Sequence, residues 1–184
     1  MKLSLLSILL GLGLAAPQVY GLARPTAFAA AARRFPRNLL AGYVLMTLGT
    51  LWFLWLVKQE PIADFAAIKP HMLAVFVAIG LGTCIFVQDF LAVRGLAIVF
   101  LLLAKLMVDT GRPHLGETPW VLLIQAWAYV LVVAGITFTV WPWRLRDLLD
   151  WATANERRVK IGSGLRLGFA LLVVVLGLTA FRAM

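Results

Sequence analysis

The fold is decided by residues 120–141, which read WVLLIQAWAYVLVVAGITFTVW and carry no charged side chain. A helix needs about 20 apolar residues to cross the roughly 30 Å of hydrocarbon in a bilayer. Trp120 and Trp141 would lie about 31 Å apart along such a helix, the spacing of tryptophans at two membrane interfaces. The stretch therefore predicts a membrane-spanning helix with a tryptophan at each interface.

Five further apolar stretches accompany this one. The composition agrees with them, because 62% of the residues are hydrophobic, 14% are charged and the mean hydropathy is +0.94, unlike a soluble domain of 184 residues. The sequence predicts an all-α integral membrane protein with about six transmembrane helices in a single polytopic domain, residues 1–184. The expected spans are residues 3–22, 39–57, 71–88, 91–109, 119–141 and 163–181.

Two of the six stretches leave alternatives open. The first has the outline of a secretory signal peptide, but Pro17 disfavours cleavage at the neighbouring small residues, so we expect an uncleaved span. In the fourth, Arg94 and Lys105 bracket a short apolar core. The alternative there is a five-span chain with a re-entrant segment, which would place the C-terminus on the cytoplasmic side.

Positive charge gives the expected orientation, because cytoplasmic loops are enriched in Lys and Arg. With six spans, the first, third and fifth connections hold eleven of these residues and the opposite side holds six. Both termini are therefore predicted on the non-cytoplasmic side. The composition, rich in Ala, Leu, Gly and Arg, is typical of a multi-pass protein of the bacterial inner (cytoplasmic) membrane.

The two long inner loops have the pattern of amphipathic helices that lie on the membrane surface. The expected interfacial helices are residues 25–35 and 144–158, on the cytoplasmic side, where their cations would meet anionic lipid headgroups. Their apolar faces are Phe28, Ala31, Ala32 and Phe35 in the first, and Leu145, Leu148, Leu149 and Ala152 in the second.

Small residues four positions apart allow membrane helices to approach closely. Two such pairs are Ala78 with Gly82 and Gly164 with Gly168. They predict close packing within the chain, with contact to another subunit as the alternative.

A group of polar residues around the fourth stretch is the first candidate site. Charged groups inside a bilayer are costly, so they are usually paired, interfacial or functional. Lys105 and Asp109 are four residues apart and could form an ion pair along one helix. The alternative is a hydrated crevice that exchanges protons or cations. The candidate intramembrane polar cluster is Gln88, Asp89, Arg94, Lys105 and Asp109.

Residues 105–113, KLMVDTGRP, contain a lysine, six further residues and then Arg-Pro. This segment resembles the first motif of the type 2 phosphatidic acid phosphatase family, whose members also have six spans. The resemblance implies a phosphate-binding site of Lys105, Arg112 and His114 at the outer face. The family's catalytic histidines lie in later motifs, whereas this chain has no histidine after His114, so no catalytic residue is predicted.

No metal site or cofactor is predicted. Cys84 is the single cysteine, and His71 and His114 lie in different loops without further ligands near them in the sequence. The net charge of +9 is expected to act on anionic lipid, and a nucleic-acid partner is not expected.

The sequence suggests three functions, which we rank from the most to the least favoured. The first is an accessory or scaffold subunit of a membrane assembly, partnered by another membrane protein or a second copy, because the spans hold few polar residues to line a pathway. The alternative is a small transporter or ion-conducting protein that uses the polar cluster. The third is a lipid-headgroup binder or degenerate phosphatidic acid phosphatase-like protein. The sequence leaves open the substrate, the oligomeric state and whether the protein is an enzyme.

Overall fold

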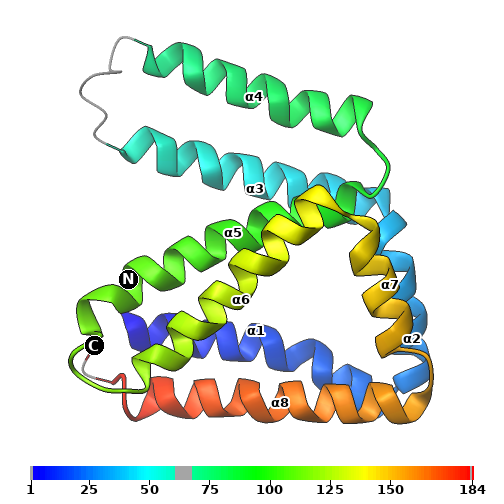
Figure 1. Cartoon of the computed structure of the whole chain (residues 1–184), viewed down its shortest axis with the longest axis vertical. Helices are drawn as coiled ribbons and strands as arrows, with labels where there is room; N and C mark the ends of the chain where they lie inside the picture. The colour runs from blue at the N-terminus through cyan, green and yellow to red at the C-terminus, as the bar shows by residue number, and fades with distance from the viewer. Residues whose placement is uncertain (1, 61–67, 183) are drawn as a thin grey trace. The chain divides into compact units, whose positions relative to one another are not determined.

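The computed structural model describes residues 2–60, 68–182 and 184, and the regular structure in this part of the chain is entirely helical (Figure 1). Six of its helices are long and apolar enough to cross a membrane, which confirms the all-α prediction and the number of candidate spans. These are α1 (Leu3–Ala23), α3 (Leu39–Gln59), α4 (Lys69–Phe86), α5 (Leu91–Gly111), α6 (Val121–Val140) and α8 (Glu156–Leu178).

In the described part of the chain, four shorter elements connect these long helices. Two ten-residue α-helices, α2 (Pro25–Arg34) and α7 (Trp143–Ala152), lie in the segments where surface helices are predicted. The 3-10 turns η1 (Phe35–Arg37) and η3 (Arg112–His114) follow α2 and α5.

Asparagine caps fix where two of the long helices begin. The Asn38 Oδ1 accepts a hydrogen bond from the backbone N–H of Ala41 at 3.1 Å, and the Asn155 Oδ1 accepts one from Arg158 at 2.9 Å. Each oxygen satisfies an N–H group that the first helical turn leaves without a partner. Because Asn155 starts α8, residues 156–158 belong to α8 and not to the predicted surface helix, and α8 begins before the predicted residue 163.

The fourth apolar stretch is one unbroken helix. α5 runs without interruption from Leu91 to Gly111 and contains both Arg94 and Lys105. A re-entrant segment would need a break in the helix within the hydrocarbon region, and α5 has none. This continuity favours the six-span arrangement over the five-span alternative.

The described helices form two compact units. The first unit contains Met1–Arg34, Leu103–Leu131 and Arg146–Met184. The second contains Phe35–Leu102 and Val132–Leu145.

In the first unit, α1 and α8 pack side by side and antiparallel (Figure 1). A Cβ atom at Gly11 would lie 2.5 Å from the Val174 Cγ2, and one at Gly21 would lie 2.5 Å from the Ser163 Oγ. A Cβ atom at Gly177 would lie 2.9 Å from the Ile8 Cγ1 and 3.0 Å from the Ser4 carbonyl oxygen, in the first turns of α1. Larger residues at these positions would force the helices apart, so glycine sets their separation.

The same unit joins the last turns of α5 to the first turns of α6. The Gln125 side-chain N–H donates a hydrogen bond to the Val108 carbonyl at 3.3 Å, where Gly111 leaves room for it. Trp127 of α6 packs edge-to-face on Phe169 of α8, with ring centres 5.1 Å apart. These contacts give the first unit a core drawn from four helices.

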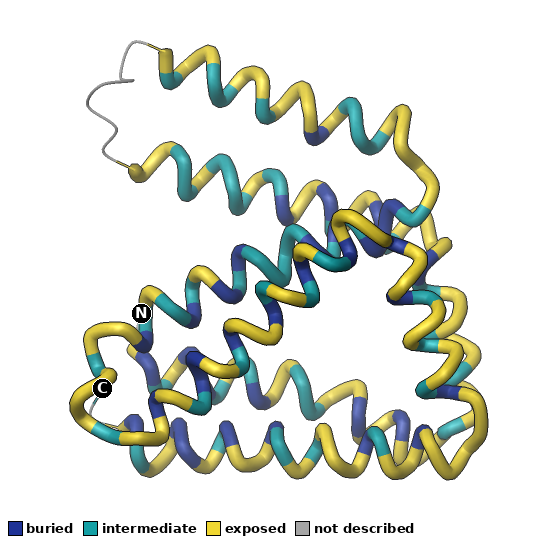
Figure 2. The backbone as a smooth tube through the Cα atoms, viewed as in Figure 1, coloured by how far each residue is buried: buried dark blue, intermediate teal, exposed yellow. Residues whose placement is uncertain are grey.

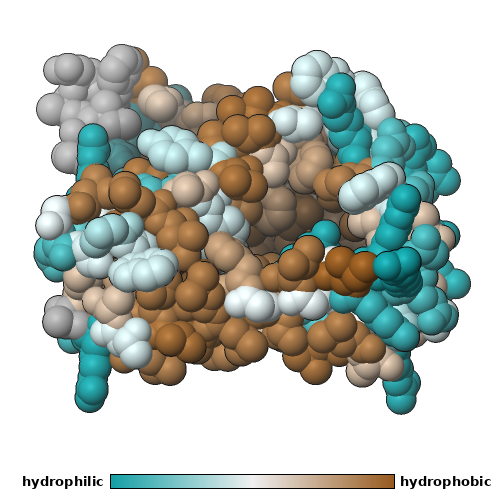
Figure 3. Space-filling view, turned by 60° about the horizontal axis from the view of Figure 1, so that its bottom comes forward, coloured by the Kyte–Doolittle hydropathy of each residue, from teal (hydrophilic) through white to brown (hydrophobic). Residues whose placement is uncertain are grey.

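The surface over α8 changes along its length. Figure 3 shows hydrophobic residues over its middle and hydrophilic ones where it begins. The hydrophilic part holds Glu156, Arg157, Arg158 and Lys160, all in the first turns. The apolar part is the only portion of α8 suited to hydrocarbon.

In the second unit, α3 and α5 pack in parallel. A Cβ atom at Gly42 would lie 2.9 Å from Leu91, and one at Gly49 would lie 2.9 Å from Ile98. Gly95 of α5 lies against the backbone of α3 between these contacts. Residue numbers rise together along α3 and α5 from one contact to the next, which shows that the two helices are parallel.

α4 packs antiparallel on α3 and contributes least to the core. Gly80 lies beside Thr50, and Phe76 packs edge-to-face on Phe53 with ring centres 4.9 Å apart. Gly80 is the one residue of α4 classed as buried, and Figure 2 shows most of this helix as exposed. α4 is therefore held by few contacts within the chain.

The small-residue pairs identified in the sequence are not the contacts that the helices use. A Cβ atom at Gly164 or Gly168 would meet nothing within 4 Å, and one at Gly82 would meet only Phe86 of its own helix, at 4.0 Å. The prediction of close packing within the chain at these pairs is therefore wrong. The close approaches occur at glycines that stand outside these two pairs.

Candidate functional site

The structure spreads the candidate polar cluster over α5 and the turn before it. Gln88 and Asp89 are exposed in that turn, where the Gln88 side-chain N–H donates to the Tyr43 hydroxyl at 3.2 Å. Arg94 lies in the first turn of α5. Lys105 lies about 16 Å further along the same helix, too far for one site to include both cations.

Lys105 and Asp109 form the predicted ion pair. The Lys105 Nζ lies 2.7 Å from the Asp109 Oδ2, and the two side chains are 44% and 56% exposed. The ion-pair interpretation of these two residues is confirmed. An exposed pair at this spacing contributes about 0.3–0.5 kcal/mol, so its effect on stability is small.

Arg94, like Asp89, has no counter-charge among the described residues, but unlike Asp89 it is partly buried. Its side chain is half-buried, and its Nε is buried without a hydrogen-bond partner in the part of the chain that the structure describes. An unsatisfied buried donor costs about 1–3 kcal/mol. Arg94 is therefore the one cluster residue that packing alone does not explain.

Two of the three residues of the predicted phosphate site face carboxylates. Lys105 is paired with Asp109, and the His114 Nδ1 lies 2.8 Å from the Glu117 Oε1. Arg112 is exposed in η3. The neighbouring carboxylates lower the attraction of this site for a phosphate.

No group of three His, Cys, Asp or Glu side chains within residues 2–60, 68–182 and 184 is placed to hold a metal ion. Cys84 is half-buried in α4.

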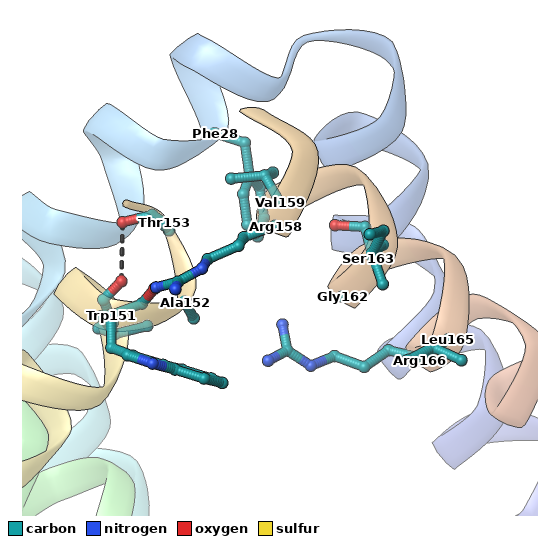
Figure 4. Close-up of a pocket in the computed structure, with 12 residues that line it drawn as sticks. Phe28, Trp151, Ala152, Thr153, Arg158, Val159, Gly162, Ser163, Leu165 and Arg166 are labelled. Atoms are coloured by element: carbon teal, nitrogen blue, oxygen red, sulfur yellow. Dashed lines mark hydrogen bonds between the residues drawn. The ribbon is translucent and has the colours of Figure 1, made fainter. Parts of the chain in front are cut away.

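A pocket of about 450 Å³ lies in the first unit, between α2, α7 and the beginning of α8 (Figure 4). Its walls combine aromatic and basic side chains. The lining residues include Phe28, Trp151, Thr153, Arg158, Ser163 and Arg166, and no Asp or Glu of the described residues is among them.

Arg33 holds α2 against the end of α7 beside this pocket. Its Nε donates to the Thr153 Oγ1 at 2.8 Å, a second guanidinium N–H donates to the Thr153 carbonyl, and the Asp150 carboxylate lies 3.7 Å away. The Thr153 hydroxyl in turn donates to the Leu149 carbonyl at 2.7 Å. This network fixes the wall of the pocket and neutralises the charge of Arg33.

Arg158 is positioned by Trp151. Its guanidinium carbon lies 5.3 Å from the centre of the Trp151 ring, and one N–H donates to the Trp151 carbonyl at 3.2 Å. Cation–π stacking of this kind restrains a long side chain. Arg158 therefore presents its remaining N–H groups from a fixed place.

Arg166 lies on the same side of α8 as Arg158, with Gly162 between them at helical spacing. Its side chain is exposed and has no hydrogen bond or ion pair with the described residues. Figure 4 shows its guanidinium directed towards Trp151, across the pocket. The pocket thus holds a positive charge that the described part of the protein does not balance.

Ser163 adds a buried hydroxyl to the pocket wall. The residue is 1% exposed, and its Oγ has no hydrogen-bond partner among the described residues. The hydroxyl lies against Gly21 of α1. An unmade hydrogen bond of a buried group costs about 1–3 kcal/mol, so this hydroxyl lowers the stability of the pocket wall.

Comparison with protein-family models, curated proteins and solved structures finds no match for this chain. Its function is therefore inferred from its own residues.

Sequence reasoning missed the pocket. Arg158 and Arg166 entered only as positive charges that set the topology, and Phe28 only as part of an apolar stripe. A local signal was present, because Arg158, Gly162 and Arg166 share one face of a helix and Trp151 precedes them. The contribution of α2 carried no such signal, since Phe28 is far from these residues in the sequence.

Proposed function

We propose that the protein is an accessory or scaffold subunit of the bacterial inner membrane, which packs against another membrane protein through α4. The observation that carries the proposal is the poor packing of α4 within the chain. Its mean hydropathy of 1.6 suits a membrane span, yet Gly80 is its one residue classed as buried. An outer face of this kind is available to a partner helix.

The directions of the helices support six crossings. α1 and α8 are antiparallel, α3 and α4 are antiparallel, and α3 and α5 are parallel. Six alternating crossings require each of these directions, whereas the five-span alternative would make α1 and α8 parallel. The proposed topology has both termini on the non-cytoplasmic side, because the connections with more Lys and Arg are then inside.

The same topology places α2 and α7 on the cytoplasmic membrane surface as amphipathic helices. Both are ten residues long, too short to span, and both join two long apolar helices. α2 ends with Arg33 and Arg34, and α7 carries Arg144 and Arg146. Cations at this level would attract anionic lipid headgroups.

A protein partner suits α4 better than lipid alone because of its small residues. Ala78 is exposed, and a Cβ atom at Gly82 would meet no other helix within 4 Å. Between apolar helices in lipid there is little hydrophobic driving force, so close packing at small residues drives association. The occupant we propose is a transmembrane helix of a different protein.

The test is site-specific photo-crosslinking in native membranes from position Ile79 of α4, followed by mass spectrometry of the product. We expect one defined membrane partner, and we expect Ala78→Leu or Gly82→Leu to abolish the product. Gly13→Leu on α1 is the matched control, since its Cβ also meets nothing within 4 Å. A product that contains only this chain would establish a homo-oligomer instead, and no product with a monomer in mild detergent would contradict the proposal.

A small transporter or ion-conducting protein is the second candidate, and the unpartnered Nε of Arg94 is the observation that favours it. The other cluster residues offer less, because Asp89 is exposed in a turn and Asp109 is paired with Lys105. If Arg94→Gln and Asp89→Asn leave ion or proton flux in reconstituted vesicles unchanged, this candidate loses its support.

A further inference from the structure

We propose that the pocket between α2, α7 and α8 binds the phosphate headgroup of an anionic phospholipid. Arg158 and Arg166 hold the phosphate, and the aromatic wall of Phe28 and Trp151 holds the adjoining glycerol and acyl carbons. The inference relies on the membrane placement proposed above. It does not depend on the protein partner of α4.

The charge of the pocket selects an anion. Two guanidinium groups line it, and no carboxylate from the described part of the chain does. The Cα atoms of Arg158 and Arg166 are about 12 Å apart along α8, but Figure 4 shows both side chains extending towards Trp151. The planar N–H groups of arginine match the oxygens of a phosphate, which accepts several hydrogen bonds at once.

The shape of the pocket favours an amphiphile over a free ion. Gly162 lines the pocket between the two arginines, and a Cβ atom there would meet nothing within 4 Å, so the space beside it is open. Phe28, Trp151 and Leu165 supply apolar surface around this space. Inorganic phosphate would leave that surface without a partner, whereas a lipid would cover it.

The depth of Arg166 also points to a lipid. The apolar part of α8 beyond it, Leu167–Leu178, is about 18 Å long, shorter than the roughly 30 Å of hydrocarbon. If the far end of this part reaches the outer edge of the hydrocarbon, the Cα of Arg166 lies inside the inner edge, and its side chain extends back towards the beginning of α8, where the headgroups lie. Lipid phosphates are the anions present at this level of a membrane.

Ser163 is a separate feature of the pocket. Its hydroxyl is 1% exposed, lines the pocket and has no hydrogen-bond partner among the described residues. Figure 4 shows the oxygen directed towards Phe28 and Val159. The Ser163 hydroxyl is thus a buried polar atom in the pocket wall beside Phe28, and it is not one of the groups assigned to the phosphate.

The test is lipid titration of the full-length protein in a neutral detergent, followed by native mass spectrometry. The probes are phosphatidylglycerol, zwitterionic phosphatidylcholine and soluble glycerol 3-phosphate. We expect saturable binding of phosphatidylglycerol at one site, weaker binding of phosphatidylcholine and none of glycerol 3-phosphate. Binding of phosphatidylglycerol should weaken as salt is added, because charge attraction contributes to it.

Two matched pairs of variants locate the site. Arg166→Gln should weaken phosphatidylglycerol binding about tenfold, whereas Arg157→Gln, which removes the same charge outside the pocket, should leave it unchanged. Gly162→Leu should fill the pocket and abolish binding, whereas Gly164→Leu, at an equally open position outside it, should not. Circular dichroism and size-exclusion profiles check that each variant is folded.

The opposite results would overturn the proposal. Equal losses in Arg166→Gln and Arg157→Gln would mean that lipid is attracted by the general positive surface. Binding of glycerol 3-phosphate as strong as that of phosphatidylglycerol would identify a site for a soluble phosphate. Unchanged lipid binding in folded Gly162→Leu would place the lipid elsewhere.

Discussion

The α1–α8 pair and the α3–α4 pair are both antiparallel pairs of apolar helices, yet they pack very differently. Their mean hydropathies overlap, at 1.7 and 2.1 for the first pair and 1.8 and 1.6 for the second. α1 and α8 approach closely at Gly11, Gly21 and Gly177, near both ends and between them, whereas α4 meets α3 closely at Gly80. Hydropathy thus identifies a span without indicating how tightly it is packed.

The difference has a physical cause. In lipid, the apolar side chains of a helix lose little by facing acyl chains, so burial alone does not draw two spans together. Contact is gained where small residues let two backbones approach, and α1 and α8 have such residues along their length. We expect the first pair to be a stable part of the fold and the second to separate more easily.

The largest effect is expected from Gly11→Leu. The new side chain would meet both the Val174 side chain and the backbone carbonyl of Ala170, 2.8 Å from the position of its Cβ, and a backbone cannot move aside cheaply. We expect a loss of about 3 kcal/mol in the free energy of unfolding, measured by denaturant titration in detergent. Gly13→Leu is the control, because it adds the same side chain to α1 where nothing lies within 4 Å. If Gly11→Leu and Gly13→Leu lost the same free energy of unfolding, close packing at Gly11 would not be what stabilises the α1–α8 pair.

A smaller effect is expected from Gly80→Leu. Its Cβ would lie 2.7 Å from both the Cγ2 and the Oγ1 of Thr50, but α4 can shift away because it has few other contacts to lose. We expect a loss of about 1 kcal/mol together with opening of the hairpin. The opening can be measured by spin-label distances between α3 and α4. Gly82→Leu serves as the control, and a loss as large as that of Gly11→Leu would contradict the comparison.

The smallest effect is expected from Ser7→Ala. Ser7 lies one helical turn from Gly11 on α1, is fully buried and has an Oγ without a hydrogen-bond partner among the described residues. Removing a hydroxyl that makes no hydrogen bond should change the free energy of unfolding by less than about 1 kcal/mol, in the stabilising direction. A clear loss in the same denaturant titration would show that polar contacts, and not close approach alone, hold α1.

Part of the candidate site could be predicted from local spacing. The ion pair of Lys105 with Asp109 depends on a four-residue interval within one helix, which the sequence contains. The pocket could not be predicted in the same way. Phe28, Trp151 and Arg166 come from three helices, and their meeting depends on the contacts of Arg33 with the end of α7.

The start of α8 is a further feature that the sequence pattern did not predict. The Asn155 cap moves the start of α8 ahead of the predicted span and transfers residues 156–158 to it. Hydropathy could not find this boundary, because the first turns of α8 are charged. The outcome matters for function, since the cap makes Arg158 and Arg166 part of one helix face.

By itself, the sequence determined the number and place of the apolar helices, because a helix needs about 20 apolar residues to cross hydrocarbon and stretches of about this length can be recognised in the sequence. It also determined the local ion pair of α5. The tertiary structure alone decided which glycines bring helices together and which leave an open face. It also decided that two arginines of α8 share a pocket with α2 and α7. Apolar helices in lipid have many partners of similar energy, so the choice depends on shape along their whole length, and shape is not a property of composition.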